Sequence, residues 1–146
     1  EEEAFGAVSA ASKLYTPQVL ALATALADHP LIDQLERRGS ARSPVCGSTL
    51  EIGIALDAAG QIAATGMRVS ACAIGQAAAA LFAQSANGAS RSGIESALDQ
   101  IEAWLRRERA EMPDWPGLDA SAGAIDYPAR HGAIVLPWKA ALAALP

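Results

Sequence analysis

Hydrophobic residues alternate with small or polar residues in one segment near the middle of the chain. In Thr49–Leu56, the large aliphatic residues occupy every second position: Leu50, Ile52, Ile54 and Leu56. This alternation predicts a β-strand with one buried face. The turn-forming run Asp57–Gly60 follows, and Ile62–Val69 predicts a second strand, so the two form a hairpin. Ser43–Val45 is expected to supply a third strand at the edge.

Four other segments carry apolar residues at the spacing of an α-helix. The first helix starts at Thr16-Pro17, where threonine caps and proline suits the first turn, and it ends before His29-Pro30. The predicted helical segments are Gln18–Leu26, Ser70–Ala89, Ser92–Arg109 and Ile134–Leu145. Between them, Glu36–Ser43 is expected to be a polar connector and Met112–Ala124 a loop.

Together these elements predict an α+β fold, in which a small antiparallel β-sheet of about three strands is covered on one face by helices. The chain has 146 residues, which suits one domain. We expect residues 1–13 to form a flexible tail and residues 14–146 to form a single domain. The hydrophobic fraction of 51% excludes an intrinsically disordered chain.

The net charge and the lack of long apolar runs argue against a nucleic-acid-binding, membrane-bound or secreted protein. The formal net charge is −5, so the chain lacks the overall basic character of proteins that bind nucleic acid or anionic membranes. The amino-terminal run EEEAFGAVSAASKLY lacks the basic and apolar regions of a signal peptide, and no apolar run is long enough to cross a bilayer. With only two cysteines, the sequence predicts a soluble protein of the reducing cytoplasm.

The two cysteines are the main candidates for chemistry. Cys46 precedes the predicted hairpin and Cys72 follows it, so both are expected at the same edge of the sheet. Cys72 also lies where a strand gives way to a helix, and the positive end of a helix stabilises a thiolate. His131 could join them. No sequence motif of nucleotide-binding proteins, proteases or hydrolases occurs.

Structural roles are the competing interpretation for these residues. A free cysteine is often a small buried hydrophobic residue, and a single histidine is often a structural hydrogen-bonding group. The three tryptophans, Trp104, Trp115 and Trp138, are expected to pack in the core. Arg106, Arg107 and Arg109 are expected to form a solvated helix face.

Three blocks of sequence resemble the NifU/IscU-type iron–sulfur scaffold family. Pro44-Val45-Cys46-Gly47-Ser48 before the hairpin resembles that family's first ligand motif, and Ala71–Ala77 resembles the start of its alanine-rich helix, which carries the second cysteine. The segment Tyr127–Ala140 is similar to the carboxy-terminal part of the SufU branch, which is known for zinc binding and sulfur transfer. The resemblance extends over about Tyr15 to Leu145.

The resemblance implies a metal site with an incomplete ligand set. Cys46 and Cys72 would be ligands of iron, a [2Fe–2S] cluster or zinc, with His131 as a third ligand and Ser48 as a weak fourth. Ser48 stands where the family has an aspartate, and Ala133 stands where it has a third cysteine. A cluster or a closed zinc site needs four ligands, which two chains of a homodimer with two thiols each would supply.

Three functions follow from this resemblance, and they favour a scaffold or carrier over an enzyme. The first is an iron–sulfur cluster assembly scaffold that receives sulfur from a cysteine desulfurase and works with other assembly proteins. The second is a sulfur-transfer or zinc-binding protein in which Cys72 is the persulfide carrier. The third is a regulatory paralogue that binds the assembly machinery without performing the chemistry.

Overall fold

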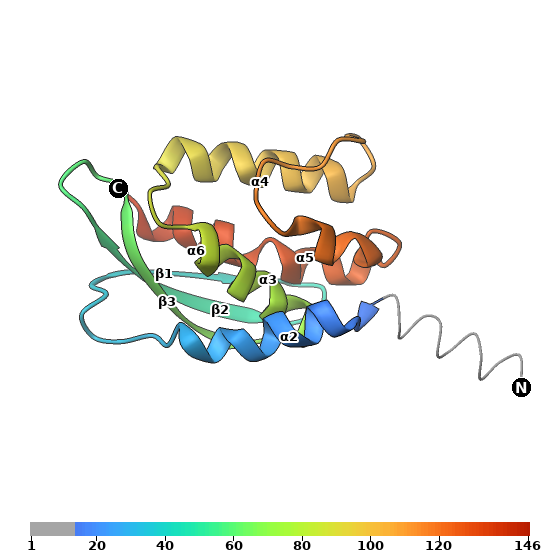
Figure 1. The fold of residues 1–146 in the computed structure, drawn as a ribbon, viewed down its shortest axis with the longest axis horizontal. Helices are drawn as coiled ribbons and strands as arrows, with labels where there is room; N and C mark the ends of the chain where they lie inside the picture. The colour runs from blue at the N-terminus through green and yellow to red at the C-terminus, as the bar shows by residue number, and fades with distance from the viewer. Residues whose placement is uncertain (1–13) are drawn as a thin grey trace, which may run out of the picture.

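A three-stranded antiparallel sheet carries helices on one face in the computed structural model, which describes residues 14–146 (Figure 1). The strands are β1 (Arg37–Arg42), β2 (Thr49–Leu56) and β3 (Ile62–Ser70), and they lie side by side in the order β1-β2-β3. The predicted α+β fold is therefore confirmed. The tail predicted for residues 1–13 lies outside the described residues.

Strand β2 is the central strand, and its alternating pattern has the expected effect. Leu50, Ile52 and Ile54 are at most 2% exposed and face the helices. The β2–β3 ladder starts with Thr49 opposite Ser70 and is regular until a bulge at Ala55/Leu56. Because Thr49, the first residue of β2, pairs with Ser70, the last residue of β3, the segment before β2 and the segment after β3 lie at the same end of the sheet.

The edge strand differs from the sequence prediction. Residues Arg37–Arg42, expected to be a polar connector, form β1, while the expected edge strand at Ser43–Val45 is wrong, because these residues begin the β1–β2 turn. Strand β1 has no alternation of large apolar residues. It is extended because it pairs with β2 along its full length, from Arg37 opposite Ile54 to Arg42 opposite Thr49.

The helices begin near the predicted positions but several are shorter. Thr16 caps the first helix through a hydrogen bond that its Oγ1 accepts from Val19 N. The α-helices are α2 (Pro17–Ala25), α3 (Ala73–Ser85), α4 (Arg91–Leu105), α5 (His131–Ile134) and α6 (Leu136–Ala144), and the 3₁₀-helices are η1 (Leu26–Asp28), η2 (Leu118–Ala124) and η3 (Pro128–Arg130). Left-handed backbone at Gly88 and Arg107 follows the ends of α3 and α4. Within the described residues, every helix is too short or too polar to cross a bilayer.

Helices α3 and α6 form the layer that lies on the sheet (Figure 1). Helix α6 contacts β1 and β2, α3 contacts β3, α2 lies along α3, and α4 packs on α6. Gly39 permits the close approach of α6, since a Cβ atom there would collide with the carbonyl oxygen of Ala140. On the opposite face, Leu31 and Leu35 cover Gly53, so that face is only partly open to solvent.

Three aromatic side chains fill the centre of the helical layer. Phe82 of α3 stacks on Trp115 with ring centroids 5.2 Å apart, and Trp138 of α6 meets both rings edge-on at 5.3 Å. Trp104 is also buried. The packing role predicted for the three tryptophans is therefore confirmed, and the chain has no exposed tryptophan that could stack on a ligand.

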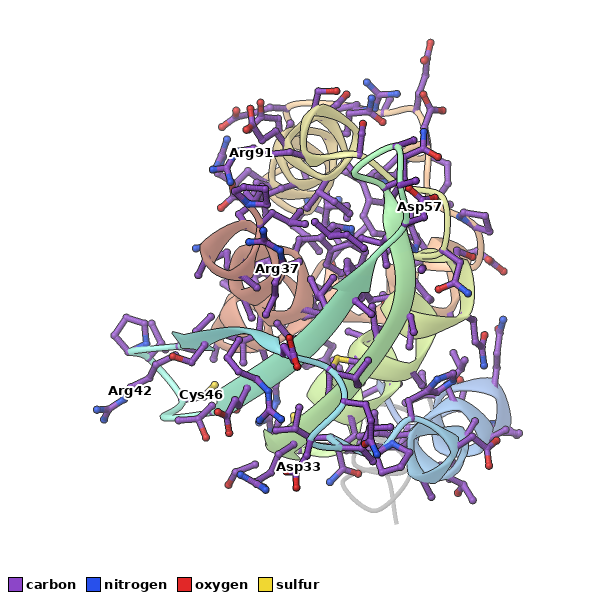
Figure 2. All side chains as sticks on the ribbon, turned by 90° about the vertical axis from the view of Figure 1, so that its left-hand side faces the viewer. Asp33, Arg37, Arg42, Cys46, Asp57 and Arg91 are labelled. Carbon is purple, nitrogen blue, oxygen red and sulfur yellow. The ribbon has the colours of Figure 1, made fainter. Side chains whose placement is uncertain are left out.

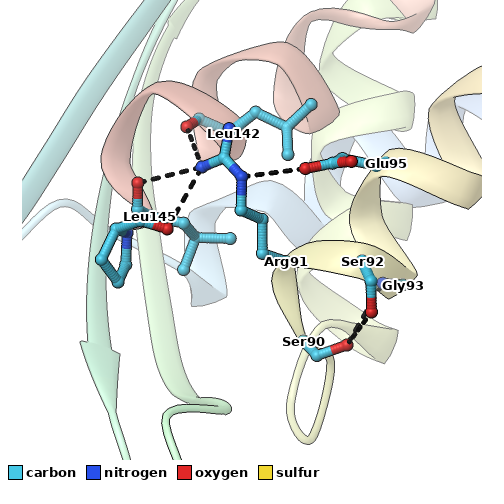
Figure 3. A network of polar contacts seen from close by, with 8 residues as sticks. Ser90, Arg91, Ser92, Gly93, Glu95, Leu142 and Leu145 are labelled. Atoms are coloured by element: carbon cyan, nitrogen blue, oxygen red, sulfur yellow. Dashed lines mark hydrogen bonds and ion pairs between the residues drawn. The ribbon is translucent and has the colours of Figure 1, made fainter.

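Arg91 ties the start of α4 to the end of α6 (Figure 3). Its guanidinium donates hydrogen bonds to the carbonyl oxygens of Leu142 and Leu145, each at 3.1 Å, and pairs with Glu95 at 2.9 Å. Leu142 lies in the last turn of α6 and Leu145 is its C-cap residue, so the guanidinium lies at the end of the helix where a cation is favourable.

We expect Arg91→Ala to lower the free energy of unfolding by about 1 kcal/mol, because the lost bonds are charge-assisted but the side chain is about half exposed. Urea denaturation followed by circular dichroism measures this change. Glu95→Ala removes only the exposed ion pair and serves as the control, with an expected loss of less than about 0.5 kcal/mol. Equal losses in the two variants would show that the carbonyl contacts contribute nothing.

Candidate functional site

The turn between β1 and β2 presents Cys46 to solvent. Two backbone hydrogen bonds of 2.8 Å close this turn, from Ser43 N to Ser48 O and from Gly47 N to Ser43 O. Gly47 has φ +72°, a conformation that residues with a Cβ atom rarely adopt. Figure 2 shows Cys46 at the corner of the sheet near Arg42. The local backbone thus holds an exposed cysteine at the end of the sheet.

Cys72 reaches the same end of the sheet from β3. It is the N-cap residue of α3, where its extended backbone turns the chain from strand into helix. Cys46 and Cys72 line one open depression of about 310 Å³. The other residues around this depression are Gly47, Ser48, Ser70, Ala71 and Arg130. Both thiols are free, Cys46 exposed and Cys72 half-buried, so the structure offers two accessible sulfur atoms in one place.

Hydroxyl groups around Cys46 favour its thiolate. The side chain of Ser43, then that of Ser48 and the backbone N–H of Ser48, lower the pKa of Cys46 from 9.0 to about 7. The thiol donates to Ser48 Oγ at 3.1 Å, and Ser43 Oγ is buried without a hydrogen-bond partner. The Ser48 hydroxyl, which already pairs with the thiol, can rotate to donate to the sulfur once it is charged. A large fraction of Cys46 is therefore thiolate, the reactive and metal-binding form, near neutral pH.

We expect Ser43→Ala to raise the pKa of Cys46 towards 9.0, because Ser43 is the largest contributor to the lowered value. Alkylation of Cys46 by iodoacetamide at pH 7 should then become slower, by about tenfold for each unit that the pKa rises. Peptide mass mapping across a pH series measures the rate at each cysteine separately. The rate at Cys72 is the internal control, and an unchanged pH profile for Cys46 would contradict the role of the hydroxyl.

His131 faces a different part of the molecule. Its Nε2 atom lies 3.0 Å from the carbonyl oxygens of both Ala124 and Ile125, and since carbonyl groups only accept, Nε2 carries the proton. The ring lines a separate pocket of about 220 Å³ beside Glu102 and Lys139. Among residues 14–146, no three histidine, cysteine or acidic side chains gather into a possible metal site. The structure thus places the two cysteines together and His131 apart from them.

The two positions that differ from the family pattern are both buried. Ser48 is 6% exposed and lies directly beside Cys46. Ala133 is fully buried at the start of the carboxy-terminal helices, where its methyl group faces Gly75, in the first turn of α3 after Cys72. The position where the resemblance expects a third cysteine therefore lies close to the helix end that carries Cys72.

Two residues at the site were not singled out by the sequence analysis. Ser43 was placed in a connector, and only the folded turn brings its hydroxyl back towards Cys46. Arg130 lies within the block that resembles the SufU branch, but nothing in the sequence shows that it lines the cysteine depression. A Cβ atom at Gly132 would collide with Ser43 Oγ, so this glycine lets the segment after Arg130 pack against the turn.

Comparisons with solved structures identify the fold. The chain superposes on the amino-terminal domain of a nitrogen-fixing NifU-like protein from Brucella abortus with a TM-score of 0.74 and 22% identity, covering 92% of this chain and 94% of that one. The chain has the fold of a NifU-type domain. No protein-family model matches the sequence, and no curated protein matches it either.

Other structures with the NifU-type fold agree with this result. A protein described as an iron–sulfur cluster assembly scaffold for the SUF system, from Fervidobacterium islandicum AW-1, gives a TM-score of 0.78 at 18% identity, with coverage of 92% of this chain and 98% of that chain. A hypothetical protein gives a TM-score of 0.60 at 17% identity, with coverage of 85% and 96%. The predicted NifU/IscU/SufU-type fold is confirmed, and the two cysteines lie on it at one end of the sheet.

Proposed function

We propose that this protein is an iron–sulfur scaffold that binds iron, or a [2Fe–2S] cluster as its cargo, through Cys46 and Cys72. The observation that carries the proposal is that two free thiols from different elements line one depression on a NifU-type fold. Thiolates are the usual ligands of iron–sulfur clusters, and Cys46 is thiolate-rich near pH 7. Solved structures with this fold include one described as a cluster assembly scaffold.

The ligand set has to be completed from outside one chain. A [2Fe–2S] cluster needs four ligands, and the depression supplies two thiols and the weakly ligating hydroxyl of Ser48. His131 Nε2 is engaged with backbone carbonyl groups, so we assign it no ligand role in this arrangement. Because Cys46 is exposed, a second copy of the chain related by a two-fold axis can contribute the other two thiols. The proposal therefore includes a cluster shared by a homodimer.

Zinc fits this depression less well. A structural zinc site is closed by four protein ligands, and a catalytic one uses three with an open position. Cys46 and Cys72 are the only histidine, cysteine or acidic side chains among the residues that line the depression. Zinc would need further ligands from a partner, as the cluster does. Unlike the cluster, a zinc site contains no bridging sulfide, so protein side chains would have to supply all of its ligands.

Anaerobic reconstitution tests the scaffold proposal. We expect protein given ferrous iron, sulfide and a reductant to develop thiolate-to-iron charge-transfer absorption and to bind about one iron per chain as a dimer, the ratio of a [2Fe–2S] cluster shared by two chains. Iron analysis and size-exclusion chromatography measure these quantities. A protein that remains colourless and free of iron would contradict the scaffold function.

Sulfur transfer is the second candidate, favoured by the lowered pKa of Cys46. In this reaction the Cys46 thiolate attacks the terminal sulfur of a persulfide on a cysteine desulfurase. A new S–S bond forms at Cys46, the S–S bond on the donor breaks, and the donor cysteine leaves as a thiolate, so no external oxidant is needed. The structure leads us to assign the acceptor role to Cys46, in place of the Cys72 expected from the sequence.

A mass spectrometric assay with a desulfurase, its cysteine substrate and this protein tests the second candidate. Transfer predicts a persulfide on Cys46 even when no iron is present. A persulfide without iron binding would support a sulfur carrier. If neither a persulfide nor bound iron forms, the regulatory paralogue is the remaining candidate function. Free thiols are needed in both reactions, which agrees with the reducing cytoplasm expected from the sequence.

A further inference from the structure

Strand β1 is an unprotected edge of the sheet. Its ladder to β2 runs through six consecutive pairs without a bulge, and the strand contains no proline. Within residues 14–146, no backbone hydrogen bond reaches its outer side, whereas β3 is covered through the Pro30–Met67 bridge and the contacts of Ile62 with residues 88–89. Natural edge strands are commonly blocked by bulges, prolines or covering segments, so this regular edge can accept another strand.

The charge of this edge is opposite to that of the molecule. Residues 37–50 contain three arginines and no acidic residue, although the chain carries a net charge of −5. Arg38 donates to the carbonyl oxygens of Leu35 and Ile32. Arg37 and Arg42, one at each end of β1, are exposed and make no ion pair in the described part of the chain. The edge therefore presents two available positive charges (Figure 2).

These charges decide which strand the edge accepts. If two copies paired through antiparallel β1 strands in matched register, Arg37 of each copy would face Arg42 of the other, and like charges opposite each other are unfavourable. An extended segment with acidic residues near both ends would place them opposite these arginines. The small residues Gly39 and Ala41 between them add no bulk that would hinder an added strand.

We propose that the β1 edge binds an extended acidic segment of a partner protein, which adds a fourth strand to the sheet. Backbone hydrogen bonds would provide affinity, and Arg37 and Arg42 would select acidic side chains. Strand β1 leads directly into the turn that carries Cys46, so a partner held along this edge lies beside the cysteine depression. Binding at this edge does not require iron or either thiol.

Fluorescence anisotropy with a labelled synthetic peptide tests this proposal. The probe alternates valine and threonine and carries glutamates spaced to face Arg37 and Arg42. We expect it to bind, and we expect Arg37→Glu and Arg42→Glu each to weaken binding by about tenfold. Arg106→Glu, an equal change of charge at the far end of α4, is the matched control and should change binding by less than about twofold.

Two further measurements separate strand addition from simple charge attraction. A peptide methylated at alternate backbone amides keeps its charge but cannot complete the ladder, so it should not bind. In unmodified protein, the parent peptide should slow amide hydrogen exchange in residues 37–42. The proposal would be overturned if the parent peptide did not bind, or if the methylated peptide bound as well as the parent peptide. It would also be overturned if Arg106→Glu weakened binding as much as Arg37→Glu and Arg42→Glu do, or if the peptide left amide exchange in residues 37–42 unchanged.

The Cys46→Ala/Cys72→Ala double variant keeps this test independent of the proposed function. It should bind the peptide as the unmodified protein does, even though it is expected to hold no iron. If the peptide binds but iron does not, the edge is an interaction surface on a protein with another chemistry. If iron binds but the peptide does not, only the interaction surface is wrong.

Discussion

Cys46→Ala and Cys72→Ala should each reduce the iron bound after anaerobic reconstitution by roughly tenfold or more, because each substitution would remove two of the four thiolates of the proposed cluster shared by two chains. The two cysteines line the same depression from different elements, so neither can replace the other. Iron analysis and the charge-transfer absorption measure the loss. Retention of iron by both single variants would contradict the site.

The same two variants distinguish the two candidate functions. A scaffold requires both thiols, so the variants should lose iron equally. A sulfur carrier requires only the acceptor, so Cys46→Ala should abolish persulfide formation while Cys72→Ala leaves it largely intact. Ser96→Ala, on the exposed side of α4, is the control for handling and purity and should behave as the unmodified protein.

Phe82→Ala should lower the free energy of unfolding by about 3–5 kcal/mol, the typical cost of removing a buried aromatic side chain. Phe82 is fully buried, and its ring centroid lies 5.2 Å from that of Trp115 and 5.3 Å from that of Trp138. Its loss leaves a cavity where α3 meets α6, the two helices that lie on the sheet. A domain of this size has a stability of about 5–15 kcal/mol, so the variant will be close to unfolding.

Chemical denaturation measures this effect, and near-ultraviolet circular dichroism should show the loss of the ordered tryptophan environment. Leu20→Ala removes another large apolar side chain, but one that is 49% exposed on α2, and should cost less than about 0.5 kcal/mol. Similar losses in the two variants would show that the aromatic cluster is not the centre of the core.

Much of the fold could be predicted from local pattern. The alternation in Thr49–Leu56 depends only on which positions are apolar, and β2 has those bounds in the structure. Thr16 and Pro17 likewise define the start of α2 through local capping. The local sequence could not predict β1, because Arg37–Arg42 has the composition of a connector. This segment is extended because β2 provides its hydrogen-bonding partners.

The sequence predicted part of the candidate site, the two cysteines, but not the orientation of His131. A cysteine on each side of a hairpin predicts proximity, because antiparallel strands return the chain to its starting edge, and Cys46 and Cys72 do line one depression. The orientation of His131 had no comparable signal. Its imidazole contacts the carbonyl groups of Ala124, in η2, and Ile125, and nothing in the local sequence around His131 indicates these partners.

The sequence by itself determined the strands of the hairpin, the helical segments, the resemblance to NifU-type proteins and the two thiols, because periodicity and residue type are local properties. Tertiary structure alone decided that Arg37–Arg42 forms the positively charged edge strand of the sheet, with no strand paired to its outer side among residues 14–146, and that the Ser43 side chain lowers the pKa of Cys46. It also decided that His131 faces elsewhere. These features depend on which distant segments pack together, such as α6 and β2 on β1, and residue patterns that are local in the sequence do not specify those contacts.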